Sequence, residues 1–181
     1  MDERIDILNA EGAFTGKTAM KSEAHLKGWY HASVHVWVYT DEGEVVLQQR
    51  AFDKDTFPGY WDVSVAGHIG AGETALSSAQ REVFEEIGLD LSPTNLKFQF
   101  RTYSEFKHGP ELMDREFHDV FLAKLKRPLS DLQKQESEVA DIKLFPLEVL
   151  LDPNKINMVP NDSAYYKRVY KLISESLPKK V

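Results

Sequence analysis

A glycine-rich loop that leads into an acidic, amphipathic helix constrains the fold of this chain more than any other feature. Three glycines, at positions 67, 70 and 72, precede a stretch from Thr74 to Ile87 in which apolar residues recur at helical spacing. These residues are Leu76, Ala79, Val83 and Ile87. Gly88 follows directly and supplies a natural helix end. We therefore expect a helix over residues 74–87 with one apolar face packed against the rest of the protein.

A second segment predicts the other kind of element. The residues from His31 to Tyr39 alternate, with the apolar residues at positions 32, 34, 36 and 38 on one face, and this period of two predicts a strand. A turn at residues 41–43 leads into a second strand that ends near Arg50. Further strands are expected near 62–65, 97–103, 117–125 and 142–145, and a last amphipathic helix at about 163–177. Strands interleaved with helices, by hairpins as well as crossovers, predict an α/β (α+β) fold with a mixed sheet covered by helices.

Length and composition limit the class of protein. A chain of 181 residues predicts a single domain over residues 1–181. It contains no cysteine, which excludes disulfides, a thiolate metal site and a cysteine nucleophile. No signal-peptide or membrane-spanning pattern is present, so the sequence favours a cytoplasmic protein that does not bind membranes. The net charge of −7 also argues against nucleic acid as a partner.

The predicted helix carries three carboxylates with a spacing that suits a metal ion. Glu82, Glu85 and Glu86 stand at i, i+3 and i+4, which places them on one side of a helix. Such a cluster is either a solvated acidic face or a site for Mg²⁺, with Mn²⁺ as the alternative, because both ions prefer oxygen ligands. A bound cation would relieve the repulsion among the carboxylates and attract an anionic substrate.

The spacing of this segment resembles the Nudix box, a Gly and a Glu followed by Arg-Glu, an apolar residue, Glu-Glu, and Gly with an apolar residue. The matching residues here are Gly67, Glu73, Arg81, Glu82, Val83, Glu85, Glu86, Gly88 and Leu89. The resemblance implies an α/β/α sandwich around a mixed sheet. It also implies metal ligands at Glu82 and Glu86 with Glu85 assisting, a backbone carbonyl of Gly67 near the metal, and structural roles for Glu73, Arg81 and Gly88. Members are often homodimers.

The chain also resembles the isopentenyl-diphosphate isomerase branch of this superfamily over roughly residues 5–150. Segments that carry the likeness are 9–12, 22–25, the strand that starts at His31, and 56–61. The resemblance implies a second set of metal ligands at His25, His31, His68, Asp114 and Glu116. It also places the catalytic cysteine of the isomerases at Ala66, and a methyl group cannot transfer a proton.

Hydrolysis needs a base for water and cations for phosphate. The base is a box glutamate such as Glu85 or Glu86, Glu138 in a later loop (preferred over Glu136), or Glu116 on a predicted strand. Arg50 and Lys54 are candidate phosphate contacts, since a guanidinium can bind phosphate oxygens in bidentate fashion. Each of these residues has an ordinary alternative as part of a solvated surface.

Together these features predict a divalent-metal-dependent hydrolase that cleaves a diphosphate bond in a small substrate. The alternatives are an isopentenyl-diphosphate isomerase-like enzyme and a non-catalytic nucleotide-binding sensor. Nucleotides, nucleotide sugars, dinucleotides and prenyl diphosphates all fit the box, and the loops expected to choose among them, 107–113 and 152–162, carry no motif. Residues 1–28 are expected to form an N-terminal extension.

Overall fold

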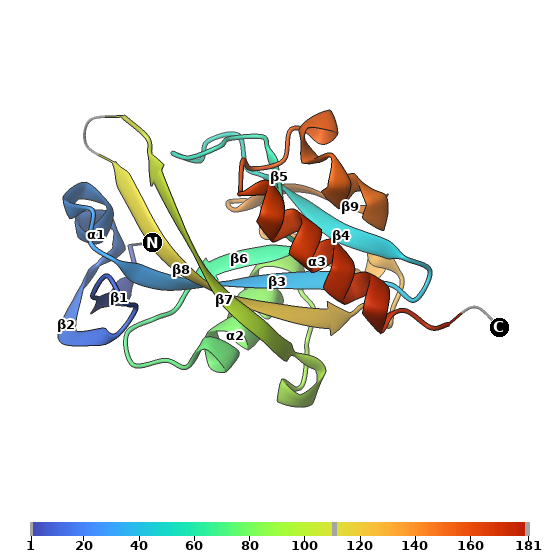
Figure 1. The fold of residues 1–181 in the computed structure, drawn as a ribbon, viewed down its shortest axis with the longest axis horizontal. Coiled ribbons are helices and arrows are strands. Elements are labelled where there is room, and N and C mark those ends of the chain that lie inside the picture. Colours follow the sequence, from blue (N-terminus) through green and yellow to red (C-terminus); the bar gives the residue numbers. More distant parts are fainter. Residues whose placement is uncertain (1, 110–111, 180–181) are drawn as a thin grey trace.

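The computed structural model describes residues 2–109 and 112–179, so part of the predicted loop 107–113 lies outside the described residues (Figure 1). The strands are β1 (Arg4–Leu8), β2 (Phe14–Met20), β3 (His31–Tyr39), β4 (Glu44–Arg50), β5 (Trp61–Asp62), β6 (Val65–His68), β7 (Lys97–Lys107), β8 (Met113–Lys124) and β9 (Val139–Pro146). The α-helices are α1 (Lys21–Lys27), α2 (Ala75–Ile87) and α3 (Ser163–Ser176). Short 3-10 helices are η1 (Pro93–Asn95), η2 (Leu129–Asp131), η3 (Leu147–Leu151) and η4 (Pro153–Ile156).

The main sheet is mixed. Its strands follow the order β5-β4-β3-β8-β7, with β6 also paired to β3 and β9 to β4. The central pair β3–β8 is parallel over its whole length, whereas the other pairs are antiparallel. This pairing sets His31 beside Glu116 and Ser33 beside His118. Two residues 85 positions apart in sequence are thereby held as neighbours at one end of the sheet.

A helix covers each face of this sheet, as the period of two along β3 requires. Val34, Val36 and Val38 pack in one core with Val83 and Ile87 of α2. On the opposite face Trp37 and Tyr39 pack in a second core with residues of α3, among them Tyr165 and Val169. Figure 1 shows α3 in front of the sheet and α2 behind it. The expected α/β/α sandwich is therefore confirmed.

Most predicted elements are present, with shifted ends. The strand at 31–39 is confirmed, but all nine of its residues are buried, so neither face meets solvent. The predicted helix is α2, with Thr74 as its N-cap and Gly88 in the left-handed conformation at its end. The prediction of a loop from Gly67 was wrong, because Gly67 and His68 belong to β6 and pair with β3. The strands expected at 97–103 and 117–125 are the longer hairpin β7–β8.

Residues 2–28 form a unit with its own strands and helix that periodicity did not predict. β1 and β2 make a two-stranded antiparallel sheet, and α1 follows β2 directly. Ile5, Ile7, Ala19 and Ala24 form a small core of their own. This unit packs against β3 and places α1 next to β8.

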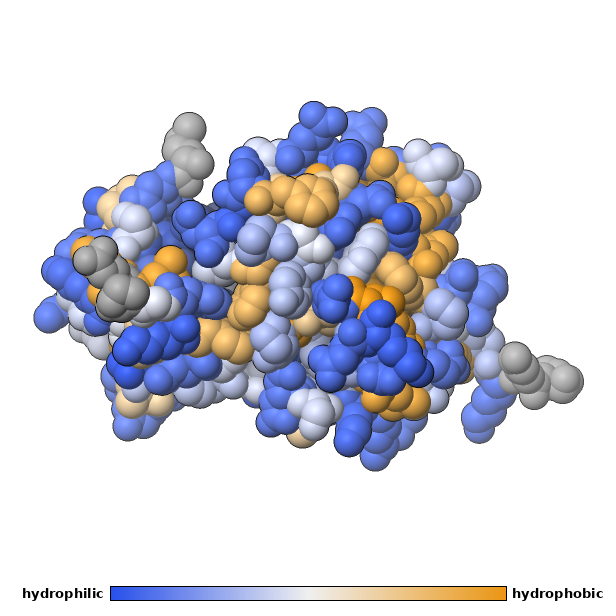
Figure 2. Space-filling model, turned by 90° about the horizontal axis from the view of Figure 1, so that it is seen from above, coloured by the Kyte–Doolittle hydropathy of each residue, from blue (hydrophilic) through white to orange (hydrophobic). Residues whose placement is uncertain are grey.

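The face seen from above in Figure 2 is mostly hydrophilic, with apolar patches between the charged residues. Among the described helices, none has the length and apolar character needed to cross a membrane.

Candidate active site

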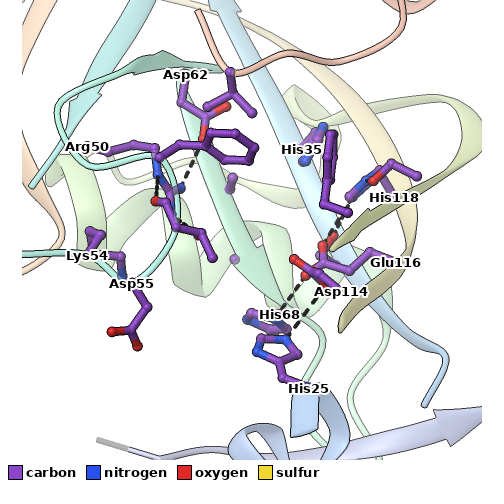
Figure 3. Close-up of a pocket in the computed structure, with 18 of the residues that line it drawn as sticks. His25, His35, Arg50, Lys54, Asp55, Asp62, His68, Asp114, Glu116 and His118 are labelled. Atoms are coloured by element: carbon purple, nitrogen blue, oxygen red, sulfur yellow. Dashed lines mark hydrogen bonds and ion pairs between the residues drawn. The ribbon is translucent and has the colours of Figure 1, made fainter. Parts of the chain in front are cut away.

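A polar cavity of about 190 Å³ opens at the end of the sheet where β3, β6, β7 and β8 come together (Figure 3). Residues of α1, the loop 51–57 and the segment before α3 complete its walls. The lining includes the charged or titratable residues Lys21, His25, His35, Arg50, Lys54, Asp55, Asp62, His68, Asp114, Glu116 and His118. The cavity therefore carries both cations and metal-type ligands.

Three histidines and a glutamate converge at one side of this cavity. His25, His31, His68 and Glu116 each offer a ligand atom, and these atoms all lie within 4.8 Å of one another. Nε2 of His31 is 3.2 Å from Nε2 of His25 and 3.3 Å from Oε1 of Glu116. Four elements contribute one residue each: α1, β3, β6 and β8. We call this group the histidine cluster.

Asp114 extends the histidine cluster. Its Oδ1 lies 3.7 Å from Nε2 of His25 and 3.6 Å from Nε2 of His31. Burial, together with the nearby Glu116, raises the pKa of Asp114 to about 8. The structure thus gathers all five residues that the isomerase resemblance implied as ligands.

Burial and the contacts with Glu116 together set the protonation of the histidine cluster. Burial lowers the pKa of His68, whereas at His31 the hydrogen bond and charge of Glu116 outweigh burial and raise the pKa. Burial alone would raise the pKa of Glu116, but the contacts with His31 and His68 outweigh it and hold that pKa well below its usual range. Burial lowers the pKa of His25 to about 4. Neutral imidazoles beside an ionised carboxylate are the forms in which these side chains bind metals.

Two buried atoms in this group of five residues lack hydrogen-bond partners, and a cation bound there would satisfy them. Among the described residues, Nε2 of His68 and Oδ1 of Asp114 make no hydrogen bond, although Nε2 of His68 lies 3.2 Å from Oε1 of Glu116. Buried polar atoms are rarely left unsatisfied. A mixed set of imidazole and carboxylate donors suits Mn²⁺, Zn²⁺ or Mg²⁺, so a divalent cation fits this group.

The box helix α2 presents its acids to the back of strand β6. Glu82 and Glu86 are buried, whereas Glu85 is exposed on the outer surface. Arg81 donates to Glu82 at 2.7 Å, to Glu85 at 3.2 Å and to Glu73 at 3.0 Å. Arg81 also donates to the carbonyl of His68 at 3.2 Å. Arg81 therefore ties the box glutamates to the strand that forms the cavity wall.

Burial changes the acidity of the two inner box glutamates. It raises the pKa of Glu82 to about 7, against the opposing effect of Arg81. It also raises the pKa of Glu86 well above the usual range, and the neighbouring Glu82 adds to this. A divalent cation bound to both carboxylates would relieve the repulsion between them and allow both to ionise. None of the described residues of α2 lines the cavity, whereas Ala66, Gly67 and His68 of β6 do.

Both predicted phosphate contacts reach the cavity, but each already has an acidic partner. Arg50 donates to Oδ2 of Asp62 at 3.1 Å and to the carbonyl and hydroxyl of Thr56. Lys54 forms an ion pair with Glu138, the proposed late base. Lys21, at the start of α1, is a third cation of the lining that sequence reasoning missed. No pattern in the sequence distinguishes it from the other surface lysines.

A buried pair of histidines, His35 and His118, also lines the cavity. His35 and His118 stack with ring centroids 4.1 Å apart. Both ring nitrogens of His118 lie 2.7 Å from serine hydroxyls, those of Ser33 and Ser104. Burial lowers the pKa of His35 to about 4 and that of His118 to about 3. Sequence reasoning gave neither residue a role at the site, and only the register of β3 with β8 reveals the pair.

Comparison with known proteins agrees with this geometry. The family model of the NUDIX domain matches residues 29–169. The chain is 38% identical over 151 residues to Nudix hydrolase 3 of Arabidopsis thaliana, covering 81% of this chain but only 20% of that protein. It is 37% identical over 150 residues to an uncharacterized Nudix hydrolase of Listeria monocytogenes, covering 82% of each.

The isomerase likeness and the fold have their own counterparts. An isopentenyl-diphosphate Delta-isomerase of Escherichia coli is 30% identical over 151 residues, covering 82% of this chain and 80% of that protein. The crystal structure of DR0079 from Deinococcus radiodurans superposes with a TM-score of 0.70 at 18% identity, covering 93% of this chain and 99% of that one. The latter likeness concerns the fold alone.

Proposed function

Because this chain belongs to the Nudix family, we propose that it is a divalent-metal-dependent hydrolase that cleaves a diphosphate bond in a small-molecule substrate. One observation carries the proposal: the complete box presses two buried carboxylates, Glu82 and Glu86, against the strand whose other side forms the cavity. A divalent cation bound between them would relieve their mutual repulsion and favour the ionised form of both.

Two groups of side chains would hold divalent cations. Glu82 and Glu86, with Glu85 nearby, would serve one at the box, and the histidine cluster with Asp114 would serve another. Mg²⁺ or Mn²⁺ is the ion we expect at the carboxylates. When bound, such an ion neutralises charge on the diphosphate and lowers the pKa of water.

The protein's own cations would bind the substrate. Lys21, Arg50 and Lys54 line the same cavity, and their charges would hold the phosphate oxygens by charge-assisted hydrogen bonds. Arg50 is fixed by Asp62 and Thr56, so its guanidinium would meet a phosphate with little loss of side-chain entropy. Attack by water then forms one P–O bond and breaks the bridging P–O bond, whose oxygen leaves with the other phosphate.

The proton released by water needs an acceptor. We propose Glu138 as one candidate, because its ion pair with Lys54 places it next to a cavity residue. Glu116 is the second, because it lines the cavity itself and stays ionised. Glu138 lies on a loop before β9 and is half-exposed, so it has the freedom to move when Lys54 binds phosphate.

Isomerisation of a prenyl diphosphate is the second candidate, and the histidine cluster favours it because the isomerase branch shares that arrangement of ligands. Ala66 stands in the cavity wall where the branch carries its cysteine. A methyl group neither gives nor takes a proton, so the two-sided proton transfer would lack one partner. We therefore place hydrolysis first.

A panel of diphosphates tests the proposal. Nucleoside di- and triphosphates, nucleotide sugars, dinucleotides and isopentenyl diphosphate are each incubated with the protein, with and without Mg²⁺ or Mn²⁺. We expect metal-dependent phosphate or nucleotide release that is lost in Glu86→Gln and kept in Glu175→Gln, an exposed control on α3. Conversion of isopentenyl diphosphate to its isomer would favour the second candidate. Saturable binding without turnover of any compound would mean that the protein is a sensor.

A further inference from the structure

A glutamine on β4 contacts the box glutamate Glu86 from outside the box. Gln48 is 3% exposed, and its Nε2 donates to Oε2 of Glu86 at 3.0 Å. It stands beside Asp62 of β5 and Ile142 of β9, so the sheet fixes its backbone on both sides. Among the described side chains of β4, no other one donates a hydrogen bond to an acidic residue of α2.

Glu86 has little else to hold it. Within the described part of the chain, its carboxylate accepts hydrogen bonds only from Gln48 and, at 3.4 Å, from the backbone N–H of Ala66. No arginine or lysine of residues 2–109 and 112–179 is paired with it, in contrast to Glu82, which accepts from Arg81 at 2.7 Å. The direction of the Glu86 carboxylate therefore depends mainly on the Gln48 amide.

The other end of the same amide is unsatisfied. Oε1 of Gln48 is buried and has no hydrogen-bond partner among the described residues. When Glu86 is ionised, as a metal ligand must be, turning the amide round would set its oxygen against a carboxylate oxygen of Glu86. Mg²⁺ keeps several of its water molecules when it binds to proteins. One of these waters would donate the hydrogen bond that the buried Oε1 of Gln48 lacks.

We infer that Gln48 is a positioning residue for the metal site of the box: its Nε2 aims the Glu86 carboxylate, and its Oε1 accepts a hydrogen bond from the hydration shell of the ion. This inference rests on the proposed function, since it requires a divalent cation at Glu82 and Glu86. Partners that orient a metal ligand commonly change metal affinity by about 10-fold to 100-fold when removed.

The test is Mn²⁺ binding, followed by EPR titration, in Gln48→Met, which keeps the size of the side chain and removes the amide. We expect affinity at the box to fall by about 10-fold or more, while a second class of sites at the histidine cluster keeps its affinity. Gln80→Met is the matched control, because the Gln80 amide on α2 donates instead to the carbonyl of Leu91. Gln48→Leu provides a second apolar variant if Gln48→Met folds poorly.

A double-mutant cycle separates positioning from a general loss of structure. In the Glu86→Gln background, Gln48→Met should cause a clearly smaller loss of Mn²⁺ affinity than in the wild type, because the ligand that it orients is gone and only the contact of Oε1 with the hydration shell remains to be lost. Unchanged affinity in Gln48→Met, or an equal loss in both backgrounds, would overturn the inference. If Glu86→Gln itself leaves Mn²⁺ binding unchanged, the box holds no ion and the proposed function fails together with the inference about Gln48. If Glu86→Gln weakens Mn²⁺ binding but Gln48→Met does not, only the inference about Gln48 fails.

Discussion

The carboxyl group of Glu82 occupies the space beside Gly67 that any larger residue would need: a Cβ added to Gly67 would lie 2.0 Å from Cδ of Glu82. No side chain can approach so closely without displacing its neighbour. The contact joins the box helix α2 to the strand β6 that lines the cavity. The glycine of the box is thus required here by close packing of a carboxylate, and its backbone conformation is not in the left-handed region.

A side chain at position 67 should push the helix α2 away from the strand β6. We expect Gly67→Ala to lower the free energy of unfolding by about 1–3 kcal/mol, as overpacked sites do, and to remove most metal-dependent turnover because Glu82 must move. Urea denaturation and the activity assay measure the two effects. In the double variant Gly67→Ala/Glu82→Ala the clash is gone, so stability should recover in part while activity stays low. A Gly67→Ala protein as stable and active as wild type would disprove this account of the contact.

The same helix shows how much of the site local sequence predicts. The residues of α2 sit at fixed angles around one axis, so their spacing alone places Glu82 and Glu86 near each other and Val83 in the core. Its cap at Thr74 and its end at Gly88 follow from local backbone chemistry. Element type and box geometry were therefore predictable. That Glu85 remains exposed while the other two are buried depends on β4 and β6, which the helix pattern does not contain.

The histidine cluster, by contrast, depends on contacts between distant segments. His31 meets Glu116 only because β3 and β8 pair in parallel with one particular register. Periodicity cannot choose that register, and it gave no signal for α1, which carries His25. Likeness to the isomerases supplied those positions instead. Neither periodicity nor the likeness to the isomerases predicted the stacked pair of His35 and His118, because neither residue belongs to a motif.

Divalent cations should stabilise the protein through the histidine cluster. A ligand that binds only the folded state adds about 2.7 kcal/mol at 100 times its Kd, so the melting temperature should rise with Mn²⁺ or Zn²⁺ and fall again with a chelator. His31→Gln should lose the part of this response that comes from the histidine cluster, because a buried ligand is gone, and keep the part that comes from the box. His108→Gln, outside the cluster, is the control and should keep it. An equal thermal shift in both variants would mean that the cation acts elsewhere.

Arg50 and Lys54 should differ in their effects on stability although both line the cavity. Arg50 pairs with Asp62, which is 4% exposed, and removal of one partner of a buried pair leaves an uncompensated charge. We expect Arg50→Met to cost about 3–5 kcal/mol of stability, and Arg50→Met/Asp62→Asn to regain part of it. Lys54→Met breaks a more exposed pair with Glu138, so its cost should not exceed about 1 kcal/mol.

The kinetics of Lys54→Met test whether Lys54 contacts a phosphate of the substrate. If Lys54 binds the diphosphate, Lys54→Met should raise KM for the substrate identified in the panel while the protein stays folded. An unchanged KM and kcat would limit Lys54 to its ion pair with Glu138. Because Lys54→Met also frees Glu138, a fall in kcat with KM unchanged would point to the base instead.

Acid should weaken the folded protein through His35. Burial holds the pKa of this histidine at about 4, below its ordinary 6.5, so the folded state favours the neutral ring and the unfolded chain takes up the proton first. The stabilising contribution is complete above pH 6.5 and is lost as the pH falls from 6.5 towards 4, at up to about 1.4 kcal/mol per pH unit. Glu116, Arg50 and the stacked His118 lie near the ring. Of these, Glu116 and His118 both have a lowered pKa, so His35 is not the only group here that takes up a proton in acid.

Replacement of His35 by a side chain that does not titrate isolates the contribution of this histidine to the pH dependence of stability. His35→Gln can keep a hydrogen bond to the hydroxyl of Tyr165, which lies 2.7 Å from Nδ1 of His35. The variant should lose less stability than wild type between pH 6.5 and 4, with the difference read from urea denaturation in the presence of a chelator. At pH 7.5 the two proteins should show similar pH slopes, since His35 is neutral in both states there. Parallel curves across the whole range would mean that His35 keeps its ordinary pKa, and that burial beside His118 does not restrain its protonation.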